Sequence, residues 1–465
     1  MVAIEGPRSM TSANASTTYV ANPNSPELVV AGTGQSADCR ALVAADRAIE
    51  QAMLEFLLAA LGFRSISGEE REFVHFVAAW GRRHGFRADL WEADEASLGA
   101  EHKKFARHIP LAGRPTLVLE LPGDPDLPSL MFNAHSDMVA ADADAWSHDP
   151  WAGTLIDGRV FGRGACDVKG PLTSALWAMM HLARRSERRG SILLELVPGE
   201  EDCVGLGTLT SVMRGWNADG LVVLEPTEQY PRCASRGGCR FEIEVLGRAV
   251  HGTVKWIGRD AIPAMCTTIG VLTELEADLN RTASSCDGQI HEGDPLFAAY
   301  PFLRPITVDA IHGGQWQGMV CDRCMCAGYF ELLPDDDVRG WQQKFIGEVT
   351  ARIAARGIRS DEVRVRFTEE YQGHRLAPNH ALCGRAAKAI SGCAGSAGFS
   401  WKGFNAGCEA GLRANRSQTP TLVWGPGSLA QAHAVDEYVE WADVRRVADM
   451  FTTFATLWTG NIDEI

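Results

Sequence analysis

The sequence predicts an α/β fold: a larger domain with a mostly parallel sheet flanked by helices, plus an inserted smaller α+β sandwich domain. Short apolar segments alternate with helical segments from about residue 115, which is typical of a parallel α/β core. Near residue 235 a strictly alternating strand pattern takes over, and an apolar strand returns only after about residue 371. The length of 465 residues also exceeds that of one usual domain.

Two helices are expected ahead of the sheet. The first spans about residues 38–62, where leucines recur on one helical face. The second opens at SGEE, in which Ser67 and Glu70 have the spacing of a capping box, and it ends near Gly85. The leucines of the first helix are Leu54, Leu57, Leu58 and Leu61.

Several apolar segments are typical of buried strands in a parallel sheet. A helix, PLTSALWAMMHLARR, is expected among them, with Pro171 in its first turn and Arg184 and Arg185 in its last. A further apolar strand, TPTLVWG, returns near the C-terminus. The segments ahead of the insertion are TLVLEL, SLMFNA, SILLELV and GLVVLE.

The inserted region shows the order strand, helix, strand, strand, helix, strand. In RFEIEVL, Phe241, Ile243 and Val245 alternate with acidic or basic residues, as in a half-exposed strand. This change of pattern divides the chain. The predicted boundaries are 1–37 for a disordered tail, 38–234 and 372–465 for the two parts of the larger domain, and 235–371 for the inserted domain.

Composition argues against several classes of function. A net charge of −15 opposes a nucleic-acid or anionic-membrane partner. No apolar run approaches the ~20 residues of a membrane span. The N-terminal stretch lacks a basic segment followed by a long apolar one, so no secretory signal is expected. The 13 cysteines are an odd number without scaffold spacing, which favours free thiols in the reducing cytoplasm.

The segment CDRCMC, with Cys321, Cys324 and Cys326, has two interpretations. Three thiols this close together could form part of a zinc knuckle. They could instead be small buried side chains of a strand. No second cysteine pair follows at the spacing of a zinc finger, which favours the second interpretation.

Side chains that can bind metals follow several of the apolar segments directly. The carboxyl ends of parallel strands meet at one crevice, so donors placed there should converge. His135 and Asp137 follow SLMFNA; Glu200 and Glu201 follow SILLELVPG; Glu225 ends GLVVLE.

Two further donors complete a set suited to a two-metal site: Asp167 in GRGACDVKG, and His433 after TLVWGPGSLAQA. Imidazoles and carboxylates without a thiolate suit Zn, Co or Mn in a hydrolytic site. Such a site needs a bridging carboxylate, about two more ligands per metal and a general base. Asp167 could also cap the helix that starts near Pro171, and the two roles are compatible.

The order of the motifs HSDMV, WSHDPWAG, DGRVFGRGACDVKG, PGEED, LEPT and GPGSLAQAHAVDEYV resembles that of the co-catalytic (dinuclear zinc) metallopeptidase family. This family holds acetylornithine deacetylase, succinyl-diaminopimelate desuccinylase, aminoacylase and glutamate carboxypeptidase. The resemblance covers nearly the whole chain after the tail. The C-terminal stretch, with Cys408, Glu409 and Ala410, looks most like the acetylornithine deacetylase branch.

The resemblance implies a site with two divalent metal ions per subunit, for which Zn is expected and Co or Mn is also compatible. Asp167 would bridge the two ions. His135 and Glu225 would hold one of them. Glu201 and His433 would hold the other, although other branches of the family use Asp in the place of Glu225.

Three more roles follow from the same resemblance. Glu200 would be the general base and later the proton donor. Asp137 would orient the imidazole of His135 through its carboxylate. His251 would stabilise the oxyanion from the inserted lid domain, reaching across a homodimer. The implied reaction is hydrolysis of the amide C–N bond of an N-acyl amino acid, a small-molecule substrate, by a metal-activated water.

Two positions of the inserted domain depart from the family pattern. Glu331 stands where relatives commonly carry Arg, and Gly318 stands near a position where they tend to carry Asn. An acid at 331 would repel a substrate carboxylate. A rival interpretation therefore keeps the dinuclear site and changes the substrate, to that of a dipeptidase, a carboxypeptidase or an aminohydrolase acting on a non-peptide amide or aryl amine. A non-catalytic binding protein should have lost a ligand or the base, and none is missing here.

Overall fold

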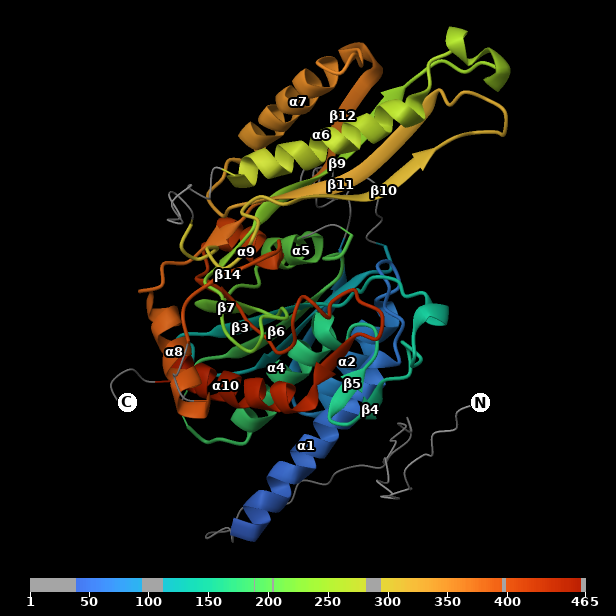
Figure 1. Cartoon of the computed structure of the whole chain (residues 1–465). Coiled ribbons are helices and arrows are strands. Elements are labelled where there is room, and N and C mark those ends of the chain that lie inside the picture. The colour runs from blue at the N-terminus through green and yellow to red at the C-terminus, as the bar shows by residue number, and fades with distance from the viewer. Residues whose placement is uncertain are drawn as a thin grey trace, which may run out of the picture.

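The chain folds around two sheets of different size, each with its own helices, as Figure 1 shows for this computed structural model. The structure describes residues 39–93, 112–187, 189–202, 205–281, 294–394 and 399–460. The mixed α/β class predicted from the sequence is confirmed. The predicted tail at 1–37 lies outside the described residues, and the predicted domain boundaries stay predictions.

The larger sheet has the strand order β1-β2-β6-β3-β7-β15. The last four strands of this order run parallel to one another, as predicted. The prediction is wrong for TLVLEL, which forms β2 and runs antiparallel to both neighbours. Burial on both faces gives a strand no periodic signal for its direction. The strands are β1 (Arg87–Glu92), β2 (Pro115–Leu121), β3 (Leu130–His135), β6 (Ile192–Val197), β7 (Gly220–Val223) and β15 (Thr421–Val423).

Helices cover both faces of this sheet. One face carries α1, α2, α4, α8 and α10, and the other carries α5 and α9. Successive residues of β2 serve the two layers in turn: Leu117 and Leu119 face the first, and Val118 faces the second. The helices are α1 (Cys39–Leu61), α2 (Arg71–Arg83), α4 (Gly170–Ala183), α5 (Leu206–Arg214), α8 (Ala381–Ala394), α9 (Glu409–Ser417) and α10 (Trp441–Thr459).

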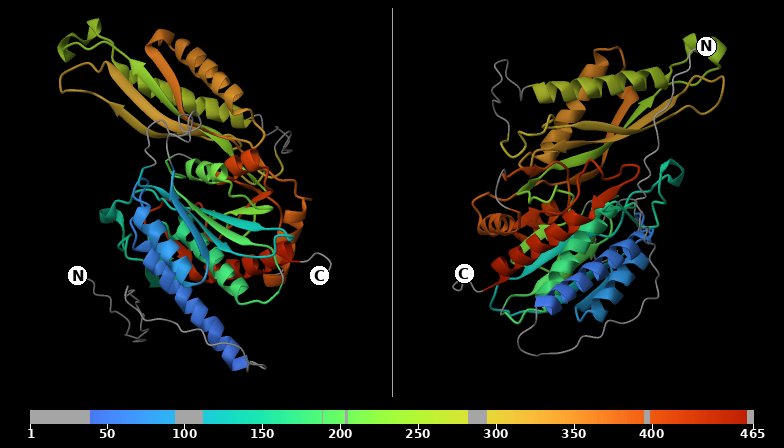
Figure 2. Two further views of the ribbon diagram at one scale, coloured as in Figure 1. Left: turned by 180° about the vertical axis from the view of Figure 1, so that it is seen from behind. Right: turned by 60° about the horizontal axis from the view of Figure 1, so that its bottom comes forward.

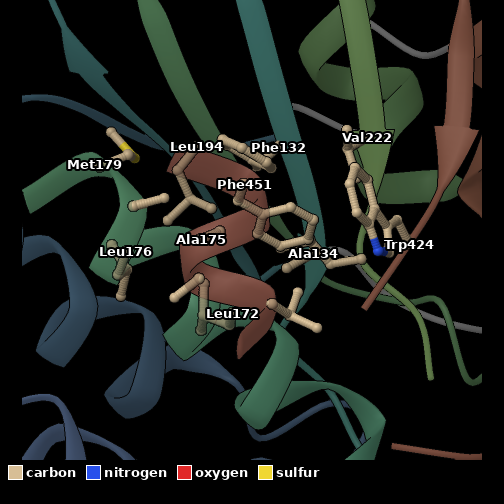
Figure 3. Packing of buried hydrophobic residues seen from close by; sticks show 14 of the residues in the cluster. Phe132, Ala134, Leu172, Ala175, Leu176, Met179, Leu194, Val222, Trp424 and Phe451 are labelled. Atoms are coloured by element: carbon tan, nitrogen blue, oxygen red, sulfur yellow. The ribbon is translucent and has the colours of Figure 1, made fainter. Parts of the chain in front are cut away.

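The core beneath the first layer is built from aromatic and aliphatic side chains of the sheet and of α4 and α10. Figure 3 shows the ring of Phe451 among side chains of this sheet and of α4. Its centroid lies 5.0 Å from that of Phe132 and 5.1 Å from that of Trp424. All three residues are fully buried, so these contacts fix α10 against the strands that carry the site described below.

The smaller sheet is wholly antiparallel, with the order β10-β11-β9-β12. Two helices, α6 and α7, pack on one face, against Phe241, Ile243 and Val245. In Figures 1 and 2 the helices lie on the side turned away from the larger sheet, so the opposite face looks toward α5 and α9. The elements are β9 (Gly237–Leu246), α6 (Ala261–Arg281), β10 (Ile306–Gly313), β11 (Arg323–Leu332), α7 (Val338–Ala354) and β12 (Val363–Tyr371).

The chain enters and leaves the smaller sheet through two short strands that pair with each other. Ala234 of β8 pairs with Arg375 of β13, and Ser235 pairs with His374. The two crossings therefore lie side by side. The remaining short elements are β4 (Thr154–Ile156), β5 (Arg159–Phe161), β8 (Ala234–Ser235), β13 (His374–Arg375), β14 (Gly403–Phe404), β16 (Tyr438–Glu440), η1 (Ala143–Ala145), η2 (Ala165–Lys169), η3 (Gly252–Ile257) and η4 (Ser360–Glu362).

Within the described residues, no helix combines the length and apolarity needed to span a bilayer.

Cys321, Cys324 and Cys326 are buried at or beside β11, with 6%, 1% and 0% exposure. The cysteine Sγ at 321 donates to the carbonyl of Arg323, which fits the interpretation of small buried side chains rather than that of a zinc knuckle.

We predict that Phe451→Ala destabilises the protein by roughly 3–5 kcal/mol, because it leaves a cavity between two buried rings. Chemical unfolding followed by tryptophan fluorescence measures this change. Met213→Ala serves as the control: its side chain is 50% exposed on α5, so its effect should stay within about 0.5 kcal/mol. Equal effects of the two substitutions would contradict the assignment of this core.

Candidate metal centre

The donor side chains predicted from the sequence meet at the carboxyl edge of the parallel strands. His135 is the last residue of β3, and Glu200 and Glu201 lie in the turn after its neighbour β6. Glu225 follows β7, on the other side of β3. These three strands are adjacent, so their carboxyl ends open into one crevice.

Two more donors come from segments outside the sheet. Asp167 lies in η2, the short kinked segment just before α4. His433 lies in the loop between β15 and β16. Ligand atoms of His135, Asp167 and Glu201 lie within 4.8 Å of one another, which is the one such group of metal-binding side chains among the described residues.

Asp167 faces two imidazoles with its two oxygens. Its Oδ1 lies 2.9 Å from Nε2 of His135, and its Oδ2 lies 3.5 Å from Nε2 of His433. The Nε2 of His433 is also 3.1 Å from the carboxylate of Glu201. A carboxylate between two such donor groups has the placement that a bridging ligand requires.

Burial and mutual repulsion dominate the electrostatics of these groups. Removal from water raises the pKa of Glu200 well above its usual range, and the charges of Glu225 and Glu201 raise it further. The pKa of Glu225 is raised in the same way, by burial and then by Asp167. Hydrogen bonds to Asp167 and Glu201 raise the pKa of His433 to about 10.

The charge of the cluster calls for cations. Asp167, Glu200, Glu201 and Glu225 carry −4 when ionised, and no lysine or arginine of the described segments forms an ion pair with them. Buried like charges are costly unless they are paired or bind metal ions. Two divalent ions would balance the four carboxylates and leave both imidazoles neutral as ligands. The donor set therefore fits a dinuclear centre.

The carboxylate of Asp137 holds the turn that carries Glu200 and Glu201. Its Oδ1 accepts the N–H groups of Gly199 at 3.0 Å and Glu200 at 3.1 Å, and its Oδ2 accepts that of Glu201 at 3.1 Å. Gly199 has a φ of +79°, which glycine adopts most readily, and this turns successive N–H groups toward one acceptor. Ser67 donates its hydroxyl to the same Oδ2 at 2.9 Å.

This arrangement differs from the expected role of Asp137. The Nδ1 of His135 meets the backbone carbonyl of Asp137 at 2.9 Å, while the carboxylate Oδ1 is 3.8 Å away. The carboxylate oxygens already accept four hydrogen bonds from the turn and from Ser67. Asp137 thus orients the imidazole through its main chain and the turn through its side chain.

A second buried carboxylate, that of Glu437, holds the main chain of the segment that carries Asp167. The Oε1 of Glu437 accepts the N–H groups of Cys166 at 2.8 Å and Asp167 at 3.1 Å, and its Oε2 accepts from Arg163. Glu437 is fully buried. Glu437 lies within the motif GPGSLAQAHAVDEYV, but a lone acid beside a loop carries no sequence signal of the groups that will donate hydrogen bonds to it.

The predicted capping box is wrong, and its two residues support the site instead. Glu70 stands at the N-cap of α2 but forms no cap with its side chain. It is fully buried and accepts from Nε and Nη2 of Arg114 at 2.9 and 2.6 Å. The same guanidinium lies 4.0 Å from the carboxylate of Asp137. The positive charge of Arg114 is therefore buried beside the carboxylate that holds the turn. Sequence spacing alone cannot tell a cap from a long-range ion pair.

His251 is not brought to the metal-binding side chains within the chain. It is exposed at the start of η3, and its Nδ1 lies 2.7 Å from the hydroxyl of Thr253. In Figure 1 η3 lies at the end of the smaller sheet that points away from the larger one. Within one chain of this structure, His251 therefore does not join the cluster.

Comparison with known proteins gives a consistent result. The model of peptidase family M20/M25/M40 matches residues 131–457, which is more than half of the chain. Acetylornithine deacetylase of Photorhabdus laumondii is 24% identical over 390 residues, covering 81% of this chain and 87% of that protein.

Solved structures show the same fold. Human carnosine dipeptidase 1 superimposes with a TM-score of 0.68 at 17% identity, over 89% of this chain and 98% of that one. A dinuclear metal binding peptidase of Bacillus subtilis superimposes with a TM-score of 0.55 at 13% identity, over 88% of this chain and 98% of that one.

We predict that Asp137→Asn weakens zinc binding roughly 10- to 100-fold, the usual cost of losing a group that orients metal ligands. An amide offers one acceptor oxygen and places N–H donors against the N–H groups of the turn. Titration against a competing zinc chelator measures the affinity. Asp219→Asn is a matched control, because Asp219 accepts the N–H of Ser129 in a loop outside the cluster. Unchanged zinc affinity in the Asp137 variant would show that the turn does not depend on it.

Proposed function

The chain belongs to peptidase family M20/M25/M40 and is a metal-dependent hydrolase of amide C–N bonds, and from this premise we propose that it releases the amine from an N-acyl amino acid. The observation that supports the assignment of the site is the position of Asp167 between His135 and His433, next to Glu200. Acetylornithine deacetylase activity is the reference, since a protein of that name is 24% identical to this chain.

We assign the residues to two metal ions as follows. Asp167 bridges them, His135 and Glu225 hold one, and Glu201 and His433 hold the other. The His135 side chain is 2% exposed and that of His433 is 51% exposed, so the cluster is closed on one side and open to solvent on the other. The substrate amide would approach from the His433 side. Zn suits these ligands, and Co or Mn would also fit them.

In the proposed mechanism, Glu200 moves the proton. Two divalent ions in this site would polarise the amide carbonyl and make the attacking water more acidic. Glu200 takes a proton from that water as its oxygen attacks the carbonyl carbon. The same carboxyl group then gives the proton to the leaving nitrogen as the C–N bond breaks. The hydrogen bonds from the turn to Asp137 hold the main chain of Glu200 still while this happens.

A second candidate keeps this chemistry and changes the substrate to a dipeptide or to a non-peptide amide. Glu331 favours it, because an acid in the inserted sheet opposes recognition of a substrate carboxylate there. The solved structures with this fold include a dipeptidase, which shows that the fold itself does not fix the substrate.

We also propose that a second copy of the chain covers an exposed apolar tip of the inserted sheet. The tip gathers side chains of η3, of the start of α6, of the end of β10 and of the β10–β11 connection. His251 adjoins it through a bridge to Met319. Large apolar side chains this exposed mark interaction surfaces. The residues and their exposed fractions are Trp256 at 76%, Ile257 at 54%, Ile262 at 41%, Ile311 at 50%, Trp316 at 79% and Met319 at 43%.

Glu200→Gln should reduce turnover by roughly 10²- to 10⁴-fold, the usual contribution of a general acid–base group, while the protein still binds two metal ions. Mass spectrometry of amine release from pooled N-acyl amino acids, dipeptides and aryl amides gives the turnover, and elemental analysis gives the metal content. Glu228→Gln is the matched control, because its carboxylate is 64% exposed and pairs with Arg232. Near-native turnover by Glu200→Gln would refute its role. Release of amine only from pool members other than N-acyl amino acids would favour the second candidate.

Trp316→Glu should convert a dimer into a monomer, because it places a charge in the apolar tip. Light scattering after gel filtration reads out the mass, with Met213→Glu on α5 as the control.

A mixture of the inactive variants Glu200→Gln and His251→Ala should recover about a quarter of wild-type activity, since half of randomly mixed dimers hold one intact site. No recovery from a mixture of proven heterodimers would rule out a role for His251 across the dimer.

A further inference from the structure

His433 is the proposed metal ligand that the surrounding protein encloses least. Its side chain is 51% exposed, whereas the side chains of His135 and Asp167 are 2% and 9% exposed. The polar contacts of its imidazole are with Asp167 and Glu201, which are themselves proposed ligands. Bound metal ions would replace those contacts. The direction of this imidazole therefore depends on the backbone of the loop that carries it.

The backbone of this loop adopts a conformation that most side chains disfavour. His433 has a φ of +61° and Asp436 has a φ of +55°, so both residues lie in the left-handed region. Residues other than glycine keep such a conformation only where the surrounding structure holds them, and they cluster at functional sites. The shape of the loop thus requires contacts with other parts of the chain.

Arg163 makes the first of these contacts. It is 4% exposed, and its Nη2 donates to the backbone carbonyl of His433 at 3.3 Å. Its Nη1 donates to the carboxylate of Glu437, which in turn accepts the N–H of Asp167. One buried guanidinium therefore connects the exposed ligand His433 with the segment that carries the proposed bridging ligand.

The segment 142–149 contacts both this guanidinium and the loop. The ring centroid of Trp146 lies 5.2 Å from Cζ of Arg163, within the range of a cation–π interaction. The next residue, Ser147, donates its N–H to Oδ1 of Asp436 at 2.8 Å. Two adjacent residues of one segment thus hold the arginine and the loop at the same time.

The two acceptors of Arg163 allow its contacts to be separated by substitution. Lysine carries the same charge on a single nitrogen and lacks the planar fork of arginine. A lysine at this position can stay paired with Glu437, which holds the main chain of Asp167, but it cannot serve the carbonyl of His433 in the same way. Arg163→Lys therefore removes the contact with the His433 loop and keeps the charge beside Glu437.

We propose that Arg163 and Asp436 are positioning residues for His433, so that the metal position to which His433 belongs depends on the segment 142–149 and the other metal position does not. This inference rests on the proposed function, in which His433 holds one of two metal ions. Arg163 and Asp436 contact no ion themselves. They fix the direction from which the imidazole meets the ion, and groups that orient a ligand set the affinity of the metal it binds.

Calorimetric titration of zinc into the metal-free full chain tests the proposal without turnover. We expect two binding steps in the wild type. Arg163→Lys and Asp436→Gly should each weaken one step roughly 10- to 100-fold, the usual cost of losing a group that orients a metal ligand, and leave the other step unchanged. Glycine adopts the φ of position 436 readily but offers no acceptor there. Asp436→Asn keeps an acceptor oxygen and should bind zinc as the wild type does.

Arg159→Lys is the matched control for the arginine. Arg159 lies on β5, four residues before Arg163, and its ion pair with Glu440 is exposed on both sides. This variant should leave both zinc-binding steps unchanged. If Arg163→Lys fails to fold, Asp436→Gly still tests the proposal, because position 436 is a half-buried loop position.

Unchanged zinc binding in both Arg163→Lys and Asp436→Gly would overturn the proposal. Equal weakening of the two steps would overturn it as well, because the residues would then support the whole centre rather than His433. The variant His433→Ala tests the proposed function separately and should lose one step. Two unaltered steps in His433→Ala would refute the assignment of His433 as a ligand. Loss of one step there, with unchanged binding in the other two variants, would refute the positioning alone.

Discussion

Four carboxylates brought together at one edge of a sheet are the constraint on which the rest of this structure depends. Asp167, Glu200, Glu201 and Glu225 would repel one another strongly without counterions, because little water reaches them. The main chains of Asp167, Glu200 and Glu201 are nevertheless held in place by other buried acids. Asp137 accepts the N–H groups of one ligand-bearing turn, and Glu437 accepts those of the segment that carries Asp167. Partial positive charge of the backbone thus offsets these supporting carboxylates, and the proposed metal ions would offset the four carboxylates of the cluster.

The topology explains why these particular segments meet. β6, β3 and β7 are neighbours and run in the same direction, so the residues that follow each of them emerge within one crevice. α4 and α10 pack against the same strands, and the rings of Phe132, Trp424 and Phe451 fix that layer. A rigid layer beneath the strand ends allows side chains from five separate segments to keep their geometry to within about 0.5 Å.

Donors that follow buried apolar strands could be predicted from the sequence, because the rule linking strand ends to a crevice needs no knowledge of distant contacts. His135, Glu201 and Glu225 are of this kind. Residues whose roles depend on partners far along the chain could not be predicted. Glu70 has the spacing of a helix cap and instead pairs with Arg114, and Glu437 contacts a segment 270 residues away. The direction of β2 could not be predicted either. The apolar sequence of a strand buried on both faces is the same for a parallel and an antiparallel neighbour.

The pairing of β8 with β13 has a consequence for how such a chain can change. Ala234 and Arg375 are cross-strand neighbours, so the ends of the intervening 140 residues are held about one strand spacing apart. The entropic cost of closing a loop across that gap rises by only about 0.6 kcal/mol each time the loop doubles in length. The segment between them can therefore be lengthened, shortened or replaced during evolution while the ligands below keep their positions. Residues such as Glu331 and Trp316 belong to this replaceable segment, and the proposed metal ligands lie outside it.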